Sequence, residues 1–337
     1  MDRVRVGLIG AGGIASAHIR GYREHADRIG VTAVADIGET ALKRRTEELG
    51  GVPGFSDYRD LLREAPIDAV DICLPHHLHR DAIVRAAESG RHILCEKPLC
   101  LSAREAEDVV AAVRGNGVAL MCAHNQLFLP AVAKARDLLD AGVLGRVYEV
   151  RTTDSFWNDF DPATMGWRAS AATSGGGELI DTGYHPTYLL LHLAGGTPIE
   201  ATAMLSTHRL TFMEGEDSAQ VLVRFDHGVV GQMVTSWAYA PAPVTERFSV
   251  VGERGSLFSA DGTSLTVTLR DGTSQTFTAE AVDTFVAEIG HFADSLIAGT
   301  RPLHTEVEGI AALGILLAAY EGAATRTIAP VISARAD

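Results

Sequence analysis

The feature that most constrains the fold is a glycine-rich run between a strand-like segment and a helix-like segment. An apolar stretch over residues 4–9 leads directly into Gly10-Ala-Gly12-Gly13-Ile14-Ala15. In the pattern G-x-G-x-x-G/A, the first glycine makes a tight turn and the second lets the backbone approach a pyrophosphate. A small third residue allows close packing of the helix on the strand. Amide groups at the start of the helix then hold phosphate oxygens. The run therefore predicts a dinucleotide site at Gly10, Gly12, Gly13 and Ile14.

The choice of dinucleotide depends on Asp36, which follows a second apolar run, Val31–Ala35. An acidic residue about twenty positions past the glycine-rich run contacts the ribose hydroxyls, and its charge repels a 2′-phosphate. This favours NAD, and NADP is the less favoured alternative. Arg44 and Arg45 are other possible contacts to a 2′-phosphate, but charged residues on an amphipathic helix usually form its solvated face. We interpret the two arginines in that way.

The first third of the chain alternates apolar runs with helical patterns. Strands that are apolar on both faces and alternate with helices are typical of a parallel, doubly wound sheet. Strands are expected at residues 4–9, 31–35, 69–74, 92–95 and 118–123. Helices are expected at residues 14–25, 39–49, 80–89 and 103–114.

The pattern changes after a predicted helix from Pro130 to Leu139. Period-two alternation and glycine-containing turns then favour an antiparallel sheet, so the predicted fold class is α/β. Strands are expected at residues 146–153, 200–207, 218–225, 229–236, 245–251 and 265–269, and helices at residues 178–193, 284–297 and 305–320. A chain of 337 residues favours two domains. We place them at residues 1–124 and 125–337.

Composition argues against several classes of partner. The chain has 29 basic and 43 acidic residues, a net charge of −14, and no basic block, so a nucleic-acid-binding surface is not expected. The N-terminus enters a strand by residue 4, without the apolar core of a secretory signal. The longest apolar stretch, residues 309–319, is too short to span a bilayer and is expected to be a buried helix. We expect a cytoplasmic protein without a membrane partner.

Neither the cysteines nor a histidine-rich loop predicts a metal site. His76, His77 and His79 form a poor ligand set, so we interpret this segment as a cofactor-side loop in which His79 begins a helix. The cysteines lie singly in or just after apolar runs, and their spacing fits no zinc site. We therefore expect buried thiols and no disulfide at Cys73, Cys95, Cys100 and Cys122.

The candidate catalytic groups are a lysine, an aspartate and a histidine. Asp181 and His185 are four residues apart in a predicted helix, so the carboxylate is expected to orient the imidazole from the same face. Imidazole titrates near neutrality and suits a general base. Lys97 precedes Pro98 at the predicted carboxyl edge of the sheet, where ligands bind in such folds, and it can polarise the oxygen that the imidazole deprotonates. The less favoured alternatives are a surface lysine and a core histidine.

These segments together resemble the Gfo/Idh/MocA family of NAD(P)-dependent sugar and polyol oxidoreductases, including its inositol dehydrogenase-like members. The resemblance spans nearly the whole chain. It implies a Rossmann domain followed by an α/β domain with a mainly antiparallel open sheet, and a catalytic set of Lys97, Asp181 and His185. Its motifs are the glycine-rich run, Leu74-Pro-His-His-Leu-His79, Cys95-Glu-Lys-Pro98, Gly166-Trp-Arg168 and Gly175-Gly-Gly-Glu-Leu-Ile-Asp181-Thr-Gly-Tyr-His185.

The resemblance also implies which other residues contact the ligands. Trp157 lies in a run, residues 154–160, that mixes polar and aromatic side chains as sugar-contacting loops do; core packing is the alternative. The cofactor contacts implied are Leu74, Pro75, His76, His79, Glu96, Lys97 and Asn125. The substrate contacts implied are His124, Trp157, Trp167, Arg168, Asp181 and His185.

Two departures from the family pattern leave the substrate open. The family frequently has an arginine shortly after the position of Asn125, where this chain reads His124-Asn-Gln-Leu-Phe128, and often an aspartate at the position of Tyr188. We expect alcohol–ketone interconversion on a sugar, inositol or related polyol by a homodimer or homotetramer. The alternatives are a non-catalytic regulator that senses NAD or a sugar, and a reductase of an imine, lactam or tetrapyrrole.

Overall fold

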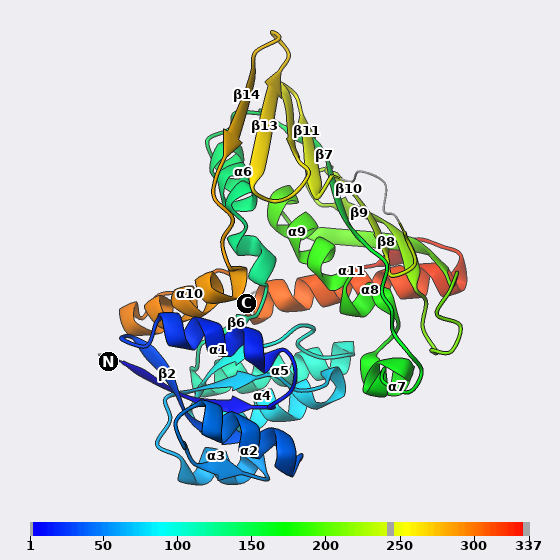
Figure 1. The fold of residues 1–337 in the computed structure, drawn as a ribbon. Coiled ribbons are helices and arrows are strands. Elements are labelled where there is room, and N and C mark those ends of the chain that lie inside the picture. Colours follow the sequence, from blue (N-terminus) through cyan, green and yellow to red (C-terminus); the bar gives the residue numbers. More distant parts are fainter. Residues whose placement is uncertain (1–2, 241–245, 333–337) are drawn as a thin grey trace. The chain divides into compact units, whose positions relative to one another are not determined.

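The computed structural model describes residues 3–240 and 246–332, which form two sheets with surrounding helices (Figure 1). Contacts between residues divide the chain into two compact units. The first comprises Met1–Asn125 and Asp283–Gly309, and the second comprises Gln126–Val282 and Ile310–Asp337. The boundary predicted near residue 124 places Asp283–Gly309 in the second domain, whereas its contacts group it with the first.

The first unit contains a six-stranded parallel sheet in the order β3-β2-β1-β4-β5-β6, which confirms the predicted doubly wound sheet. The strand order reverses beside β1, because β1 pairs with both β2 and β4. Ligands bind at such a switch point, outside the carboxyl ends of the strands. The strand β3, which has two residues, was not predicted. The strands are β1 (Val4–Ile9), β2 (Ile29–Ala35), β3 (Gly54–Phe55), β4 (Ala69–Ile72), β5 (His92–Cys95) and β6 (Leu120–Cys122).

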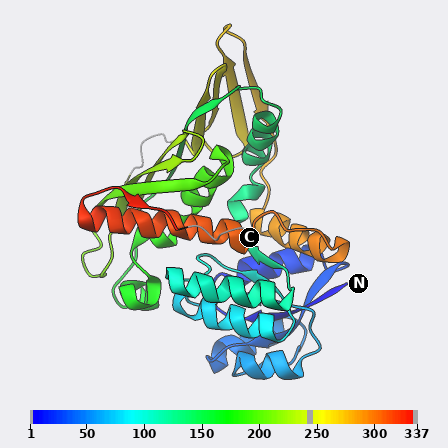
Figure 2. The same cartoon turned by 180° about the vertical axis from the view of Figure 1, so that it is seen from behind.

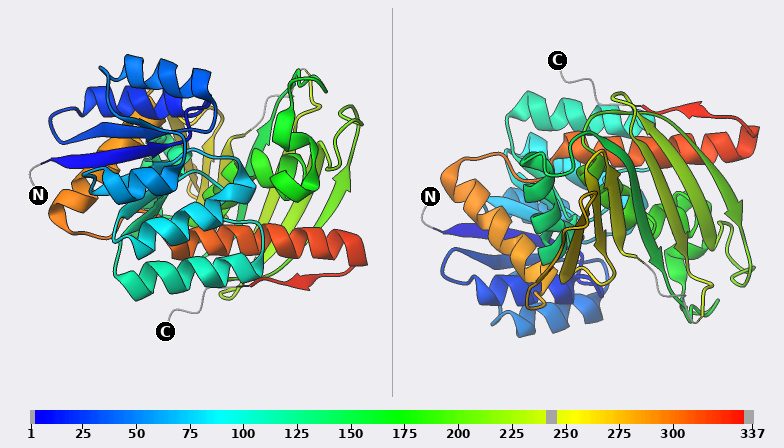
Figure 3. Two further views of the ribbon diagram at one scale, coloured as in Figure 1. Left: turned by 90° about the horizontal axis from the view of Figure 1, so that it is seen from below. Right: turned by 90° about the horizontal axis from the view of Figure 1, so that it is seen from above.

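Helices cover both sides of this sheet (Figure 3, left). Ser102 begins α5 by accepting the amide of Glu105, and Asp283 begins α10 by accepting the amides of Phe285 and Val286. Such caps satisfy amides that have no partner within a helix. The short α3 was not predicted. The helices of this unit are α1 (Ala15–Glu24), α2 (Glu39–Glu48), α3 (Tyr58–Glu64), α4 (His79–Glu88), α5 (Ala103–Asn116) and α10 (Thr284–Ala298).

The second unit contains a nine-stranded sheet in the order β14-β13-β12-β11-β7-β10-β9-β8-β15 (Figure 2). Among the residues that the structure describes, β7 and β10 are the only neighbours in this sheet that pair in parallel, so the prediction of a mainly antiparallel sheet is confirmed. Three short strands, β12, β14 and β15, were missed. Residue 245, where one strand was predicted to begin, lies outside the described residues. The strands are β7 (Val147–Ser155), β8 (Pro198–Ser206), β9 (Ser218–Phe225), β10 (Val230–Ser236), β11 (Phe248–Gly252), β12 (Gly255–Ser259), β13 (Ser264–Leu269), β14 (Ser274–Thr278) and β15 (Ala329–Pro330).

One face of this sheet is covered by α9 (Tyr184–Ala194), which packs on β7 and β10. The opposite side chains alternate outward, and apolar residues such as Met204 and Leu222 remain 83% and 51% exposed. The unit also contains α6 (Pro130–Asp140) and α7 (Ala171–Ser174).

The twenty-residue helix α11 (Glu306–Thr325) is long and apolar enough in composition to cross a membrane. Its apolar side chains include Leu313 and Ile315, both fully buried in the protein. Burial of this kind is typical of a core helix, as the sequence predicts for residues 309–319.

The helix expected over residues 178–193 is two helices, α8 (Glu178–Asp181) and α9. The amide of Gly183 bonds the carbonyl of Glu178 at 2.9 Å, one residue further back than in an α-helix. A Cβ at Gly183 would lie 2.5 Å from the carbonyl oxygen of Leu179, so only glycine fits this junction. Asp181 and His185 therefore do not share the face of one continuous helix.

Candidate active site

The glycine-rich loop has the shape that a pyrophosphate requires. Gly10 has φ +101°, and a Cβ there would lie 2.3 Å from the carbonyl oxygen of Cys73. Gly12 and Gly13 are exposed, and a Cβ on either would meet no atom of the described residues within 4 Å. The loop ends at the first residue of α1. This open approach beside a helix N-terminus fits the phosphates of a dinucleotide.

Asp36 follows the last residue of β2 and lies beside the same loop. Its carboxylate accepts the amide of Ala11 at 2.6 Å and the amide of Gly38 at 2.7 Å. The backbone thus fixes the carboxylate at the carboxyl end of β2, next to the glycine-rich loop. This is the place from which an acidic residue reaches the ribose of a bound dinucleotide.

Arg45 is not on a solvated helix face, so that part of the sequence interpretation is wrong. Its side chain is buried, and its guanidinium donates to the carbonyl of Gly12 at 2.9 Å and to the hydroxyl of Ser16. The turn leaves loop carbonyls without strand partners, and a long cationic side chain satisfies them. Arg44 is exposed and donates to the carbonyl of Ala11 at 3.3 Å.

Lys97 emerges two residues after β5. Its amide donates to the carboxylate of Glu96 at 3.1 Å. Nearby, the two ring nitrogens of His79 lie 2.7 Å from the carbonyls of Leu74 and Pro98. Burial lowers the pKa of His79, and a neutral ring donates to one of these carbonyls at a time. His79 thus ties the loop after β4 to the Glu-Lys-Pro segment. His76 is also buried.

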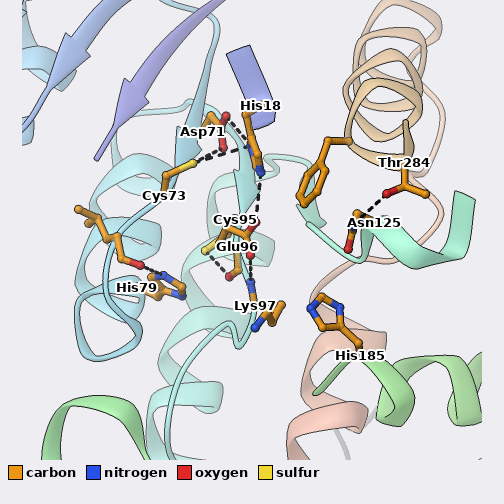
Figure 4. A network of polar contacts seen from close by, with 12 residues as sticks. His18, Asp71, Cys73, His79, Cys95, Glu96, Lys97, Asn125, His185 and Thr284 are labelled. Carbon is orange, nitrogen blue, oxygen red and sulfur yellow. Dashed lines mark hydrogen bonds and ion pairs between the residues drawn. The ribbon is translucent and has the colours of Figure 1, made fainter. Parts of the chain in front are cut away.

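A buried polar cluster that was not predicted from the sequence extends from His18 to Glu96, the residue before Lys97 (Figure 4). The ring of His18 bonds Asp71 through Nδ1 at 2.9 Å and Glu96 through Nε2 at 3.1 Å, and the hydroxyl of Tyr22 donates to Asp71 at 2.9 Å. Burial opposes the charge on His18, but Asp71 prevails and the pKa of His18 lies well above its usual value. The ring is therefore an imidazolium that donates to both carboxylates. The available signal was Asp71, an acid inside an otherwise apolar strand.

Cys73 joins this cluster, with Sγ 3.5 Å from Asp71 and 3.8 Å from His18. The donor atoms of these three residues are close enough to hold a metal ion. However, both nitrogens of His18 already bond carboxylates, and burial raises the pKa of the Cys73 thiol to about 12. A metal needs the thiolate and a free imidazole lone pair. The cluster is a hydrogen-bond network. Cys95, Cys100 and Cys122 are likewise buried thiols, as predicted.

Glu288 on α10 adds a buried carboxyl group near this network. Its side chain is fully buried, and neither carboxyl oxygen has a hydrogen-bond partner among the residues that the structure describes. Burial raises the pKa of Glu288 well above its usual value; the charge on His18 acts against this shift, and the nearby Glu96 and Asp71 act with it. Burial therefore favours the uncharged acid form of Glu288.

His124 and Asn125 follow β6 and are both buried. Nδ1 of His124 lies 2.7 Å from Nδ1 of His304, so one ring donates and the other accepts. The side-chain amide of Asn125 donates to the hydroxyl of Thr284 at 2.9 Å. The structure thus places both predicted ligand contacts against the segment Asp283–Gly309 of the same unit.

In the second unit, the structure brings together three of the predicted substrate residues. Nε of Arg168 donates to the carboxylate of Asp181 at 2.6 Å, and the Arg168 guanidinium stacks 4.3 Å from the ring of Trp167. Trp157 is 47% exposed, and the guanidinium of Arg209 lies 3.9 Å from its ring. An exposed tryptophan beside a cation does not behave as a core residue, which favours the binding interpretation of Trp157.

His185 lies at the start of α9 and is held by Tyr188. Its Nδ1 is 2.8 Å from the Tyr188 hydroxyl, and the Tyr188 ring is fully buried. The sequence predicted that a carboxylate four residues earlier orients this ring. The structure adds a phenol three residues later as a partner of the ring, and it pairs Asp181 with Arg168. The spacing from His185 to Tyr188 on a helix was the signal that could have found it.

Glu178 is a second buried carboxyl group missed in the sequence. One oxygen accepts the hydroxyl of Thr235, and the other has no hydrogen-bond partner among the described residues. Burial raises the pKa of Glu178 well above its usual value and so favours its neutral acid form. It begins α8, the helix that ends at Asp181.

Two protein-family models match separate segments of the chain. A model of an oxidoreductase family with an NAD-binding Rossmann fold matches residues 4–124. A model of the GFO/IDH/MocA C-terminal domain matches residues 132–258. Together they cover both the glycine-rich loop and the Asp181/His185 region.

The chain is similar to characterised enzymes over nearly its full length. It is 30% identical over 332 residues to dTDP-3,4-didehydro-2,6-dideoxy-alpha-D-glucose 3-reductase from Actinomadura kijaniata, covering 95% of this chain and 96% of that protein. It is 28% identical over 333 residues to 1,5-anhydro-D-fructose reductase from Ensifer adhaerens, covering 97% and 98%. A solved structure of levoglucosan dehydrogenase with NADH and levoglucosan has a TM-score of 0.89 and 25% identity, covering 98% of this chain and 100% of that one.

Proposed function

Because the chain belongs to the Gfo/Idh/MocA family of NAD-dependent oxidoreductases, we propose that it interconverts a secondary alcohol and a ketone on a sugar, inositol or related polyol. The observation that carries this proposal is that Lys97, Asp181 and His185 are all present and that each makes a specific polar contact. The amide of Lys97 bonds Glu96, whose carboxylate belongs to the buried cluster around His18. Asp181 is paired with Arg168, and Nδ1 of His185 contacts Tyr188.

NAD fits the first unit on two grounds. The open side of Gly12 and Gly13 at the start of α1 suits the pyrophosphate, and the fixed carboxylate of Asp36 suits the ribose hydroxyls. Arg45 is occupied by the carbonyl of Gly12 and is not available to a 2′-phosphate. When bound, NAD supplies the nicotinamide that accepts or returns the hydride.

The remaining chemistry belongs to side chains. In the oxidative direction, we propose that Nε2 of His185 accepts the hydroxyl proton, because Nδ1 is engaged with Tyr188. Lys97 donates a hydrogen bond to the same substrate oxygen and stabilises the alkoxide as charge develops there. In the reductive direction, the protonated His185 returns the proton. Asp181 is neutralised by Arg168, so we assign it to a neighbouring hydroxyl of the substrate.

Carbohydrate is the substrate class that the relatives support. The enzymes named above act on a deoxysugar nucleotide, an anhydrofructose and levoglucosan. In this chain, the exposed Trp157 and the stacked Trp167 offer apolar ring faces beside charged groups, as carbohydrate sites do. Inositols, aldoses and anhydrosugars are therefore the first compounds to test.

The test is the appearance of NADH at 340 nm with a panel of inositols, aldoses and anhydrosugars, using NAD and NADP in parallel. We expect at least one compound to be oxidised, and Lys97→Ala to abolish most of that rate. DNA binding with and without NAD is measured on the same protein. DNA binding that depends on NAD, with no compound oxidised and no ketose reduced, would contradict the enzymatic function and favour a regulator.

We further propose that the protein is a homodimer or a homotetramer. The face of the second sheet opposite α9 leaves Met204 and Leu222 exposed, and a second copy of the same face is the usual cover for such a surface. Light scattering at micromolar concentration should return a multiple of the 35.8 kDa chain mass. A monomer mass would contradict the proposal.

A further inference from the structure

The contact between His185 and Tyr188 decides which nitrogen of the proposed base meets the substrate. Nδ1 of His185 and the hydroxyl oxygen of Tyr188 are 2.8 Å apart, and their ring centroids are 5.6 Å apart at an angle of 77°. Residues three apart on a helix share one face, so α9 itself brings the two rings together. A short hydrogen bond between two rings of one helix restricts rotation of the imidazole.

The hydroxyl of Tyr188 is itself fixed from another element. The amide of Gln126, in the short helix η2 (Asn125–Phe128), donates to this oxygen at 3.1 Å. The side chain of Gln126 is held in turn, because its carbonyl accepts from Arg247 at 3.2 Å and its amide donates to Asp154 at 3.3 Å. The Tyr188 ring is fully buried and packs edge-on against Tyr184. The support for His185 is therefore rigid.

We propose that Tyr188 is the positioning residue of His185: its hydroxyl holds Nδ1 and leaves Nε2 to exchange the substrate proton. This inference rests on the proposed function. A phenol both donates and accepts, so it can hold the ring in each form that proton transfer requires. The imidazolium and the base with its proton on Nδ1 both donate to the Tyr188 oxygen. The other neutral form, with its proton on Nε2, accepts the Tyr188 proton instead.

Proton balance leaves Tyr188 unchanged throughout. In oxidation the substrate O–H bond breaks and an Nε2–H bond forms, while Nδ1 keeps its proton and Tyr188 keeps its own. The backbone amide of Gln126 donates to the Tyr188 oxygen and cannot accept a proton from it. The role of Tyr188 is to orient the ring, and the support that it gives carries no charge. A carboxylate in the same place would instead add a negative charge beside the imidazolium.

Kinetics of four proteins test the proposal: the parent, Tyr188→Phe, His185→Ala and the double variant. Tyr188→Phe keeps the buried ring and removes only the hydroxyl. We expect kcat to fall about tenfold, the effect of one lost hydrogen bond, with the Kd of NAD and the KM of the substrate within about twofold. If Tyr188 acts through His185, the double variant and His185→Ala should have the same kcat, because the Tyr188 hydroxyl then has no base to position.

Tyr320→Phe is the matched control. It removes another tyrosine hydroxyl of the second unit, one that donates to Glu216 at 2.9 Å. Tyr320→Phe should lower the melting temperature but should keep the kcat of the parent, unlike Tyr188→Phe. A kcat of Tyr188→Phe within twofold of the parent would overturn the proposal, as would an equal loss in the presence and absence of His185.

A spectroscopic measurement on the parent protein stands apart from activity and from the folding of any variant. Long-range ¹H–¹⁵N correlation spectra of protein with ¹⁵N-labelled histidine, assigned with His185→Gln, report the hydrogen bonding of each ring nitrogen. We expect a hydrogen-bonded Nδ1 for His185 that shifts in Tyr188→Phe. An Nδ1 signal typical of a free nitrogen would overturn the proposal. If no sugar or polyol is turned over, the proposed function fails while this measurement still decides the contact.

Discussion

The two units prepare for a ligand in different ways. In the first, backbone groups shape the site. Gly10 makes a turn that admits no side chain, and the carboxylate of Asp36 is held by two backbone amides. In the second, side chains hold side chains, as Arg168 holds Asp181 and Tyr188 holds His185. Backbone sites suit a cofactor of constant shape, whereas paired side chains can be exchanged without rebuilding the fold. Substrate choice should therefore depend on the second unit.

The largest expected effect lies in the second unit. His185→Ala removes the proposed proton acceptor, and general-base catalysis contributes about 10²- to 10⁴-fold. We expect kcat to fall by that range while the Kd of NAD and the melting temperature change little. Raising the pH should partly restore the rate, because hydroxide replaces the missing base. Steady-state kinetics beside calorimetric NAD binding check this, and near-parental turnover would mean that another residue takes the proton.

Lys97→Ala should have the next largest effect and tests the first unit for a chemical role. The lysine donates most strongly when negative charge develops on the substrate oxygen, so kcat should fall about a hundredfold. NAD affinity should stay within about threefold of the parent. Lys97→Arg is a control that keeps the charge but changes the shape of the donor. A large loss of NAD affinity with unchanged kcat would assign Lys97 to the cofactor instead.

Asp36 provides a contrast with Lys97 and His185, because its substitution should affect cofactor binding and not the hydride-transfer step. We expect the parent to prefer NAD over NADP by at least about tenfold in kcat/KM, or roughly 1.4 kcal/mol, and Asp36→Ala to narrow that ratio. Asp36→Asn keeps an acceptor for the amides of Ala11 or Gly38 and removes the charge. Equal kcat/KM for the two cofactors in the parent would contradict the role of Asp36.

The last expected effect concerns stability and not catalysis or binding. Burial raises the pKa of Glu288 above its ordinary value of 4.5, so the folded protein keeps this proton after the unfolded chain has lost it. Stability from this group is fully present below about pH 4.5 and is lost as the pH rises toward the folded pKa, by about 1.4 kcal/mol per pH unit.

Glu288→Gln removes this loss. The melting temperature of the parent, compared with that of the variant, should therefore fall by a few degrees between pH 5 and pH 7. Melting curves of both proteins across this range are the measurement. A difference that stays constant with pH would show that Glu288 is ionised in the folded state.

Much of the first unit could be predicted from the sequence because its signals are local. The strand β1, the glycine-rich loop and Asp36 lie within 36 residues, and each has a steric or electrostatic reason that one segment expresses. Arg45 was misinterpreted because its partner is the loop carbonyl of Gly12, which is distant in sequence. The same holds for His18, which meets Asp71 and Glu96 only in the folded sheet.

In the second unit, the identities of Asp181 and His185 were readable, but their partners were not. A continuous helix over residues 178–193 was expected. The helix breaks between Asp181 and Tyr184, and a Cβ at Gly183 in this break would lie 2.5 Å from the carbonyl oxygen of Leu179. Tyr188 was recognised only as a departure from the family pattern. Its hydroxyl became informative once the structure placed it on His185.

The most direct test of the separation between cofactor binding in the first unit and proton transfer in the second is a pair of measurements on Asp36→Ala, His185→Ala and the double variant. NAD Kd is measured by calorimetry, and the rate of NADH formation is measured at saturating NAD with the best substrate. We expect Asp36→Ala to change mainly the Kd of NAD and His185→Ala to change mainly the rate of NADH formation. The double variant should show both losses in full, because changes at independent sites add in free energy. A His185→Ala protein that loses NAD affinity as strongly as it loses rate would contradict the separation of the two roles.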